Sequence, residues 1–251
     1  TVYLYNADMY RIMRNFKKAK ENYQLYKSLV PNDTRADVGL KSCEKQDDFV
    51  ASKTRHIVTN EDKLNSKGID MAPMFGDRKN SQMVYSVSKS DKGGIDPRSG
   101  ENYMDLWVAE LDKKGNWMAP KPIVGDEINT EDNEGTVCFD GRGKKMFFTR
   151  CPNVKKQNLG CDIWVSDLSG KSWGKPTKLI LKNNDSISVG HPCVSADGRF
   201  LIFASDMAGG FGGRDLWYTT YDRRSDSWAT PINMGAGINT PGNELFPTFA
   251  E

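Results

Sequence analysis

One short motif in the sequence has the spacing of a covalent catalyst. The run Gly170-Lys-Ser-Trp-Gly174 matches the G-x-S-x-G nucleophile elbow, in which a serine on a sharp turn attacks an acyl carbon. That elbow needs a strand before it and a helix after it, whereas here it precedes a Trp-x-x-Pro segment that recurs elsewhere in the chain. The recurring copies place Asn116 and Ser227 at the position of Ser172, so we interpret the match as accidental.

The two histidines also fit no catalytic pattern. His56 and His191 stand alone, without the spacing of a metal site or a triad. His191 occupies a repeat position that another copy fills with Thr136. A position that accepts threonine is a poor choice for a general base, so the sequence predicts a protein that is not an enzyme.

A glycine-rich loop and two acids raise the question of a bound phosphate or metal. Gly209-Gly-Phe-Gly-Gly213 lacks the Lys-Ser/Thr that would reach phosphates, and we interpret it as a connector whose glycines permit positive φ. Asp206 and Asp215 on the same loop could offer oxygen ligands to Ca²⁺. The other copies have no matching oxygen cluster, so we expect no metal and no cofactor.

The five cysteines follow no metal-ligand spacing. Cys138 and Cys193 hold equivalent repeat positions, which favours small buried strand residues. Cys151 and Cys161 flank one loop and could pair in an oxidising compartment. The sequence leaves the disulfide and two free thiols equally open.

Composition excludes two classes of partner. With 35 Lys and Arg against 33 Asp and Glu, the net charge of +2 gives no reason to expect nucleic-acid binding. The longest purely apolar run, Phe200–Ala204, is far shorter than the roughly 20 residues that a membrane-spanning helix needs. We therefore expect no membrane-spanning segment.

The first 50 residues have the period of helices. Residues 1–31 read as two helices, separated near Asn15 and ended by Pro31-Asn-Asp33, with an apolar stripe at three- and four-residue steps. The stripe consists of Met9, Ile12, Met13, Phe16, Ala19, Tyr23, Tyr26 and Val30. A further helix, predicted from Thr34 to about Asp47, would cap the pair.

These helices resemble a tetratricopeptide repeat, a unit of 34 residues with small and aromatic residues at set places. The matching positions are Tyr3, Ala7, Tyr10, Ala19, Tyr23 and Pro31. Tyr26 departs from the pattern, because a small residue is usual there, and looser packing would follow. The resemblance implies a concave partner-binding side with Leu4, Asp8 and Arg11 on it. An ordinary helical hairpin without a binding role is the alternative. One such repeat cannot bury its own faces, so we expect earlier repeats to precede it.

The rest of the chain repeats itself at intervals of 53 to 57 residues. An Asp-x-Trp motif occurs at Asp105–Trp107, Asp162–Trp164 and Asp215–Trp217, and a Trp-x-x-Pro motif begins at Trp117, Trp173 and Trp228. Ile128-Asn-Thr130 with Glu134 recurs as Ile238-Asn-Thr240 with Glu244. Repeats of this kind predict four-stranded propeller blades, with tryptophans packed between adjacent sheets. The aspartate before each tryptophan would accept hydrogen bonds from turn N–H groups.

The sequence thus predicts an α+β multidomain chain: a helical repeat with its capping helix over 1–50, a linker over 51–64 and an all-β propeller over 65–251. Within the propeller we place blades at about 65–131, 132–187 and 188–242. Residues 243–251 would open a further blade, which makes the three blades a minimum and the propeller truncated.

In detail the blades resemble the PD40, or WD40-like, propeller repeat. The match is carried by Pro192–Gly198, Phe200–Ser205 and the glycine-rich approach to Asp215–Trp217. The first copy matches least, with a longer loop from Lys89 to Tyr103. Helical repeats leading into such blades are similar to OmpA-family, outer-membrane-associated Bacteroidota proteins, one of which is an accessory of the type IX secretion system.

This resemblance implies a periplasmic, non-enzymatic scaffold. It would dock other envelope or secretion proteins and be tethered to peptidoglycan by a domain outside residues 1–251. Two other functions remain open: a propeller that gates a serine peptidase, and a glycan-binding propeller. A peptidoglycan-binding module or a hydrolase domain after the propeller would separate the first two, whereas tryptophans recurring in every blade favour core packing over glycan contact.

Overall fold

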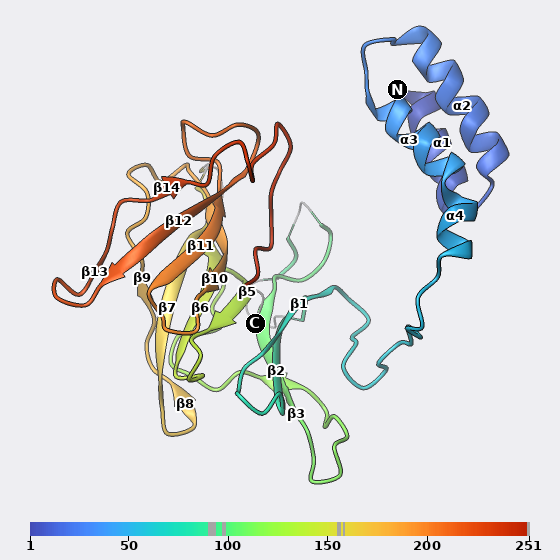
Figure 1. The fold of residues 1–251 in the computed structure, drawn as a ribbon. Helices are drawn as coiled ribbons and strands as arrows, with labels where there is room; N and C mark the ends of the chain where they lie inside the picture. Colours follow the sequence, from blue (N-terminus) through green and yellow to red (C-terminus); the bar gives the residue numbers. More distant parts are fainter. Residues whose placement is uncertain (90–93, 97–98, 155–156, 158, 250–251) are drawn as a thin grey trace. The chain divides into compact units, whose positions relative to one another are not determined.

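A computed structural model describes residues 1–89, 94–96, 99–154, 157 and 159–249. The chain forms two compact units, Thr1–Thr59 and Asn60–Glu251, which we name the helical unit and the sheet unit (Figure 1). Part of the Lys89–Tyr103 loop and the last two positions of the expected further blade lie outside the described residues.

The helical unit consists of α1 (Val2–Ile12), α2 (Phe16–Leu29), α3 (Arg35–Glu44) and α4 (Gln46–Ala51). Asn15 caps α2, because its side-chain oxygen accepts a hydrogen bond from the N–H of Lys18 at 3.2 Å. The single capping helix predicted over Thr34–Asp47 is instead two helices. Lys45 lies between them with ψ near zero, which interrupts the α-helical hydrogen-bond ladder.

Small residues set the spacing of the first three helices. Ala7, Ala19 and Ala36 are fully buried, so the helices approach closely. Tyr26 is also buried, and its hydroxyl donates to Asp33 at 2.6 Å. The side chain of Tyr26 is thus accommodated in the core, and looser packing of this helix pair stays a prediction. The expectation that Leu4 faces a partner is wrong, since its side chain is 3% exposed and belongs to this core.

The sheet unit contains three antiparallel sheets (Figure 1). Sheet 1 has the order β1 (Asp70–Phe75), β2 (Gln82–Val87), β3 (Asp105–Glu110), β4 (Lys121–Pro122). Sheet 2 has β5 (Asn133–Phe139), β6 (Lys145–Cys151), β7 (Asp162–Ser169) and β8 (Ser172–Trp173), with β9 (Thr177–Lys178) also paired to β7. Sheet 3 has β10 (Val189–Val194), β11 (Phe200–Ser205), β12 (Asp215–Asp222) and β13 (Ser227–Trp228), with β14 (Ile232–Asn233) also paired to β12.

The outermost strand differs from the prediction in two of the sheets. Four strands were expected in each copy, and sheet 1 has four, but sheets 2 and 3 have five. In both, the strand that contains the Trp-x-x-Pro tryptophan ends before the proline and a second short strand follows it. Pro176 and Pro231 have no N–H to donate, so the ladder is interrupted at that point.

The first strand of every sheet carries a β-bulge. The pairing register shifts between Met71 and Met74, between Gly135 and Val137, and between Gly190 and Cys193. The bulge residues Ala72, Thr136 and His191 have φ of 53°, 40° and 54°. Phe246, in the segment after sheet 3, has a φ of 54°. Bulges re-aim side chains, and this one recurs at the same position of each repeat.

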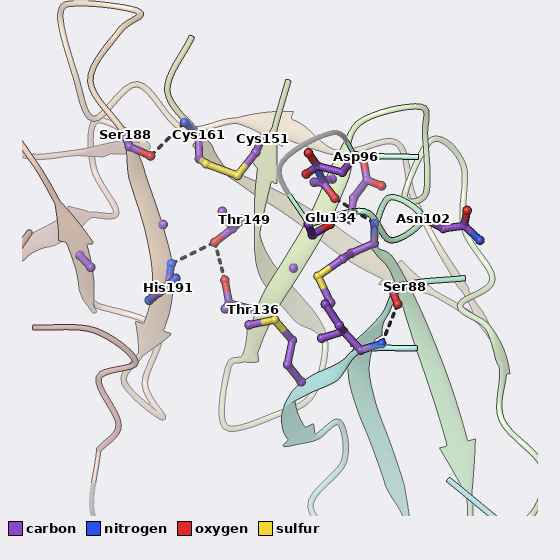
Figure 2. A pocket seen from close by; sticks show the side chains of 18 of the residues that line it. Ser88, Asp96, Asn102, Glu134, Thr136, Thr149, Cys151, Cys161, Ser188 and His191 are labelled. Carbon is purple, nitrogen blue, oxygen red and sulfur yellow. Dashed lines mark hydrogen bonds between the residues drawn. A yellow bond between two sulfur atoms is a disulfide. The ribbon is translucent and has the colours of Figure 1, made fainter. Parts of the chain in front are cut away.

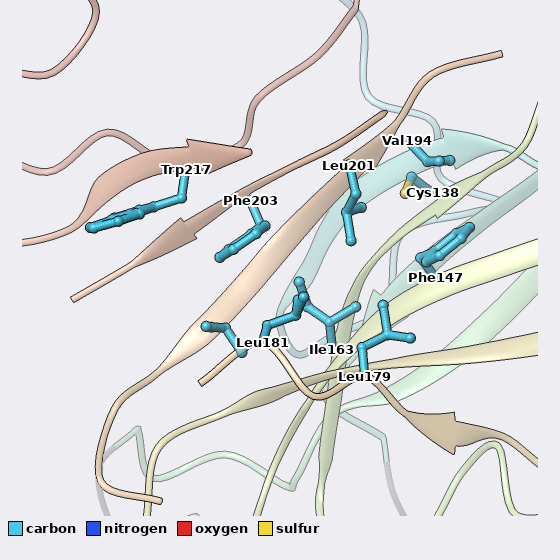
Figure 3. Packing of buried hydrophobic residues seen from close by; sticks show 10 residues of the cluster. Cys138, Phe147, Ile163, Leu179, Leu181, Val194, Leu201, Phe203 and Trp217 are labelled. Carbon is cyan, nitrogen blue, oxygen red and sulfur yellow. The ribbon is translucent and has the colours of Figure 1, made fainter. Parts of the chain in front are cut away.

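Two apolar clusters hold the sheets together. Phe147 and Ile163 of sheet 2 pack with Leu201, Phe203 and Trp217 of sheet 3 (Figure 3). The cluster between sheets 1 and 2 contains Val84, Leu106, Met146, Phe148 and Trp173. Of the other repeat tryptophans, Trp164 packs against this second cluster, Trp228 stands edge-on to Phe147, and Trp107 and Trp117 pack beside Tyr85 on the other face of sheet 1.

No helix within the described ranges is both long and apolar enough to span a membrane.

Candidate functional site

A pocket of about 260 Å³ lies where the three sheets approach one another (Figure 2). Its lining includes Met71 and Ser88 of the first repeat, Glu134, Thr136 and Thr149 of sheet 2, and His191 and Arg214 of the third repeat. The bulged strands β1, β5 and β10 all contribute, so the repeat itself builds this three-sheet pocket.

A disulfide forms part of the wall. Cys151 and Cys161 are bonded to each other, which ties the end of β6 to the residue before β7 (Figure 2). Cys43, Cys138 and Cys193 are free and buried. The sequence left open whether Cys151 and Cys161 form a disulfide or two free thiols, and in the structure they form the disulfide.

A buried charged pair beside the pocket joins two strands of sheet 2. Glu134 and Arg150 meet at 2.8 Å, and their side chains are 0% and 7% exposed. Arg150 also donates to the carbonyl oxygens of Glu127 and Ile128, while Thr130 donates to Glu134 through its N–H and its hydroxyl. Burial raises the pKa of Glu134 to about 7 even with Arg150 beside it. With its oxygens engaged in this way, Glu134 serves the fold.

A chain of polar contacts links sheets 2 and 3 across the pocket. The hydroxyl oxygens of Thr136 and Thr149 are 2.5 Å apart, and the N–H of His191 donates to Thr149 at 2.9 Å (Figure 2). The ring of His191 stacks on Phe246 with centroids 4.1 Å apart, and its Nδ1 accepts the N–H of Phe246 at 3.3 Å. His191 therefore fastens the segment that follows sheet 3.

The electrostatics of His191 agree with this bracing role. Burial, helped by the positive charge of Arg214, lowers the pKa of His191 to about 4. The imidazole is neutral at pH 7 with Nδ1 already accepting a backbone proton. Within the described part of the chain, no hydroxyl or thiol donates to this ring, so the nucleophile–base contact of covalent catalysis is not formed here.

The depressed pKa of His191 predicts acid sensitivity. In the unfolded chain His191 has a pKa near 6.5, whereas in the folded chain its pKa is about 4. Between these pH values the unfolded state therefore binds more protons than the folded state. The contribution of His191 to the stability of the sheet unit should be complete above pH 6.5 and be lost as pH drops through 4, by roughly 2 kcal/mol after allowance for partial exposure of the ring. Urea unfolding followed by tryptophan fluorescence measures it, because all six tryptophans lie in this unit.

The matched variant is His191→Thr, which installs the residue of the equivalent position in sheet 2. It should remove the pH-dependent part of the loss between pH 6.5 and 4 while leaving the chain folded. An unchanged pH profile in this variant would show that another group titrates in that range.

The three repeat aspartates do different things. Asp215 accepts hydrogen bonds from the N–H groups of Phe211 and Gly212, as expected for a turn acceptor. Asp162 instead forms ion pairs with Lys178 and Lys182, both at 3.0 Å. Asp105 is buried at 7% exposure. The sequence predicted that all three aspartates accept hydrogen bonds from turn N–H groups. Asp162 does not fit this prediction, because its partners are lysines.

The other motifs that suggested chemistry have structural places. Ser172 lies in β8 and the next element is the strand β9, so the helix that a nucleophile elbow requires is missing at this point of the described chain. Asp206 accepts the N–H of Ser188, whereas Asp215 serves its own loop. Among the described residues, no group of three acids, histidines or cysteines could hold a metal ion.

On the helical unit, Asp8 and Arg11 are already in contact with a buried side chain. The hydroxyl of Tyr23 donates to Asp8 at 2.5 Å, and Arg11 donates to the same hydroxyl oxygen at 3.1 Å. Both side chains remain about 40% exposed. Of the three residues predicted to meet a partner, these two are accessible and Leu4 is not.

Sequence reasoning missed three residues that connect the sheets at or beside the pocket. Thr149, Arg150 and Lys182 belong to no recurring motif, because the equivalent positions in the other copies carry different residue types. The recurrence of Glu134 as Glu244 was the available signal that a buried acid here needs a partner.

Comparison with known proteins gives distant fold similarity alone. No protein-family model matches the chain, and no curated protein matches it. Similar solved structures include an alpha-L-arabinofuranosidase from Lactobacillus brevis, at 15% identity over 63% of this chain and 53% of that chain, with a TM-score of 0.42. Another is the β-propeller domain of the Trilobed protease from Pyrococcus furiosus, at 18% identity over 67% and 43%, with a TM-score of 0.38.

A third is a puromycin-hydrolyzing peptidase from Mycobacterium tuberculosis, at 11% identity over 70% of this chain and 24% of that chain, with a TM-score of 0.40. The chain thus spans between about a quarter and about half of the length of these proteins. At such identities their activities do not carry over to this chain.

Proposed function

We propose that this chain is a non-enzymatic docking scaffold, in which a tetratricopeptide-type helical repeat and the blades of a propeller, three or more, hold other proteins. We further propose that it works in the periplasm at the outer membrane, within a secretion or cell-envelope complex. A domain outside residues 1–251 would tether it to peptidoglycan, as in the OmpA-family Bacteroidota proteins that the sequence resembles.

The propeller part of this proposal is supported by contacts that repeat from sheet to sheet. Asn129 accepts the N–H of Leu106 at 2.8 Å, and Asn239 accepts the N–H of Leu216 at the same distance. Asn133 accepts the N–H of Met104 in the same way that Asn243 accepts that of Arg214. Segment 243–249 thus begins as β5 does, which favours sheets that continue around one axis.

The docking part is carried by one observation on the helical unit: an apolar stripe on α1 is exposed. Its members follow one another at three- and four-residue steps, so they share one face, and each is between 53% and 69% exposed. They are Val2, Tyr5, Met9 and Ile12. A contiguous exposed apolar face marks an interaction surface, since water contact with it is unfavourable. The three-sheet pocket, by contrast, has its most reactive groups engaged in internal bonds.

The test uses the full-length protein, crosslinked in its own cells and identified together with whatever copurifies. Tyr5→Glu with Met9→Glu places two charges in the stripe and should abolish recovery of outer-membrane or secretion proteins. Lys17→Glu with Gln24→Glu makes two substitutions at exposed positions of α2 and should leave recovery intact.

Two results would overturn the proposal. One is that the stripe variant recovers the same envelope proteins as the unaltered protein. The other is that the unaltered protein recovers none of them and instead cleaves peptides or binds glycans, which would make the propeller a gate or a lectin.

A further inference from the structure

A larger cleft, of about 880 Å³, lies between sheets 1 and 2 at their hairpin-turn ends. The β1–β2 turn, the β5–β6 turn and the β7–β8 turn line it, together with the end of β3 and the strand β4. The three-sheet pocket lies at the other ends of these strands, so the two sites are separate. We name this second site the basic cleft.

The walls of the basic cleft are held by contacts between turns. Arg78 of sheet 1 donates through Nε to the carbonyl oxygen of Gly141 in sheet 2 at 2.5 Å. Gly141 in turn donates to the carbonyl oxygen of Ala196 in sheet 3 at 3.0 Å. Gly143 has a φ of 63°, and a Cβ there would lie 2.9 Å from the carbonyl oxygen of Gly76. The turns are therefore packed backbone to backbone, and the cleft is a preformed feature.

Charge in the cleft is strongly one-sided. Six basic side chains line it and only two acidic ones, and both acids have local partners. Asp77 accepts the N–H groups of Ser81 and Gln82 within its own turn, and Glu110 pairs with Lys121 at 3.1 Å. Arg142 pairs with Asp140 at 3.6 Å, so the unmatched charge lies on Arg78, Lys79, Lys144 and Lys171.

Three of these lysines are available to a ligand. Within the described residues, the ammonium groups of Lys79, Lys144 and Lys171 form no ion pair, and all three residues are exposed. They come from three different turns, so they surround the cleft. The lining of the cleft is thus clearly positive in a chain whose net charge is only +2.

The floor of the cleft is apolar. Val108, Ile123 and Trp173 form it and are nearly buried, while Val124 and Met118 at its side are 56% and 43% exposed. A ligand that fills this cleft meets apolar surface below and positive charge around it. Both terms contribute to affinity only for a ligand that carries negative and apolar groups together.

We propose that the basic cleft binds an extended acidic segment of a partner protein that also carries apolar side chains. This proposal names the partner chemistry of the docking function above and rests on it. A peptide with acidic and apolar residues in alternation can direct carboxylates to the lysines and apolar side chains to the floor, because successive side chains of an extended strand point to opposite sides. A polyanion without apolar groups would leave the floor unused.

The first experiment measures binding to the full chain by titration calorimetry. The probe is a heptapeptide of alternating glutamate and leucine, compared with a glutamine–leucine peptide and with heptaglutamate. The alternating acidic peptide should bind, and binding should weaken as salt is raised. The glutamine peptide should bind at least roughly tenfold more weakly, and heptaglutamate should also be weaker.

Lys144→Glu with Lys171→Glu should reduce affinity for the acidic peptide by roughly tenfold or more, since two attractive contacts become repulsive. Lys113→Glu with Lys114→Glu makes the same change of charge in a turn of sheet 1 outside the cleft and should leave affinity unaltered. Tryptophan fluorescence in urea verifies that both variants are folded.

Three outcomes would overturn the inference: no binding of the acidic peptide by the unaltered chain, equal binding by the Lys144–Lys171 variant, or binding of heptaglutamate as tight as that of the alternating peptide. The last would define a general polyanion surface. Crosslinking in cells separates this failure from that of the docking function. If the cleft variant still recovers the envelope proteins, only the inference fails; if the unaltered protein recovers none, the docking function fails.

Discussion

Arg150→Met is expected to lower the free energy of unfolding of the sheet unit by about 3–5 kcal/mol, because it leaves the carboxylate of Glu134 buried without its cation. The variant also removes the donor to the carbonyl oxygens of Glu127 and Ile128. These two residues belong to the segment that leads from sheet 1 to sheet 2, which we call the first crossing; the equivalent segment from sheet 2 to sheet 3 is the second crossing. Methionine keeps much of the apolar volume of the arginine stem, so the loss measures the charge together with the hydrogen bonds that the guanidinium donates. Tryptophan fluorescence in urea reports this unit alone, since the helical unit has no tryptophan.

Two controls separate the buried charge from general damage. Adding Glu134→Gln to Arg150→Met should restore part of the lost stability, since the orphaned charge is then gone. Lys175→Met removes the cation of an exposed pair with Glu127 and should cost far less, because water and salt screen that pair. Equal losses from Arg150→Met and Lys175→Met would contradict the account of Arg150 as a buried clamp.

The pH dependence of the Arg150→Met variant carries its own sign. The pKa of Glu134 is already raised to about 7 by burial, and loss of Arg150 removes a charge that lowered it. A folded-state pKa above the unfolded value means that the folded chain binds more protons, so the variant should lose stability as pH rises from about 4.5 through 7. Its defect relative to the unaltered protein should be smaller at pH 5 than at pH 8.

Lys182→Met is the second substitution with a large expected effect, again about 3–5 kcal/mol. The side chain of Lys182 is 4% exposed and pairs with Asp162 at 3.0 Å. It also donates to the carbonyl oxygens of Cys161 and Ile187 at 2.9 and 2.6 Å. The substitution leaves a nearly buried acid and two carbonyl oxygens without this donor, in the crossing from sheet 2 to sheet 3.

A matched control exists at the same acid. Lys178 pairs with Asp162 at 3.0 Å as well, but its side chain is 35% exposed. Lys178→Met should therefore cost about 1 kcal/mol or less, because water replaces the lost partner. If both methionine variants lose the same stability, burial of Lys182 is not what makes it important.

Arg150→Met and Lys182→Met alter equivalent connections between neighbouring sheets, but the side chains that stabilise the two connections differ. The first crossing is held by Asn129, Asn133 and the Glu134–Arg150 pair. The second crossing has Ser188 in place of Asn133, where its hydroxyl accepts the N–H of Cys161 at 3.1 Å. Lys182 supplies the cation there. The connection between sheets thus lies at the same position in each repeat, whereas the polar side chains that stabilise it differ from one repeat to the next.

The helical segment, the sheet repeat and their order along the chain could be predicted from local sequence signals. Helical period over residues 1–31 and motifs at intervals of 53 to 57 residues were enough to predict helices followed by repeated antiparallel sheets. Such signals are local: an apolar period, a turn or a proline acts within a few residues, so it can be read without the fold. The absence of a catalytic constellation was likewise a prediction from motif context.

Contacts between side chains that are distant in sequence depend on the tertiary fold and could not be predicted in this way. Arg150 joins Glu134 across 16 residues, Lys182 joins Asp162 across 20, and His191 joins Phe246 across 55. None of these pairs recurs in every copy of the repeat, so the periodicity of the sequence does not predict them. Leu4 illustrates the same limit, because its exposure depends on how α1 packs against its neighbours rather than on its place in the repeat. The basic cleft, too, exists only because turns from distant parts of the chain pack side by side. Their lysines, each of which is an ordinary surface residue in the sequence, together produce a positive electrostatic potential there.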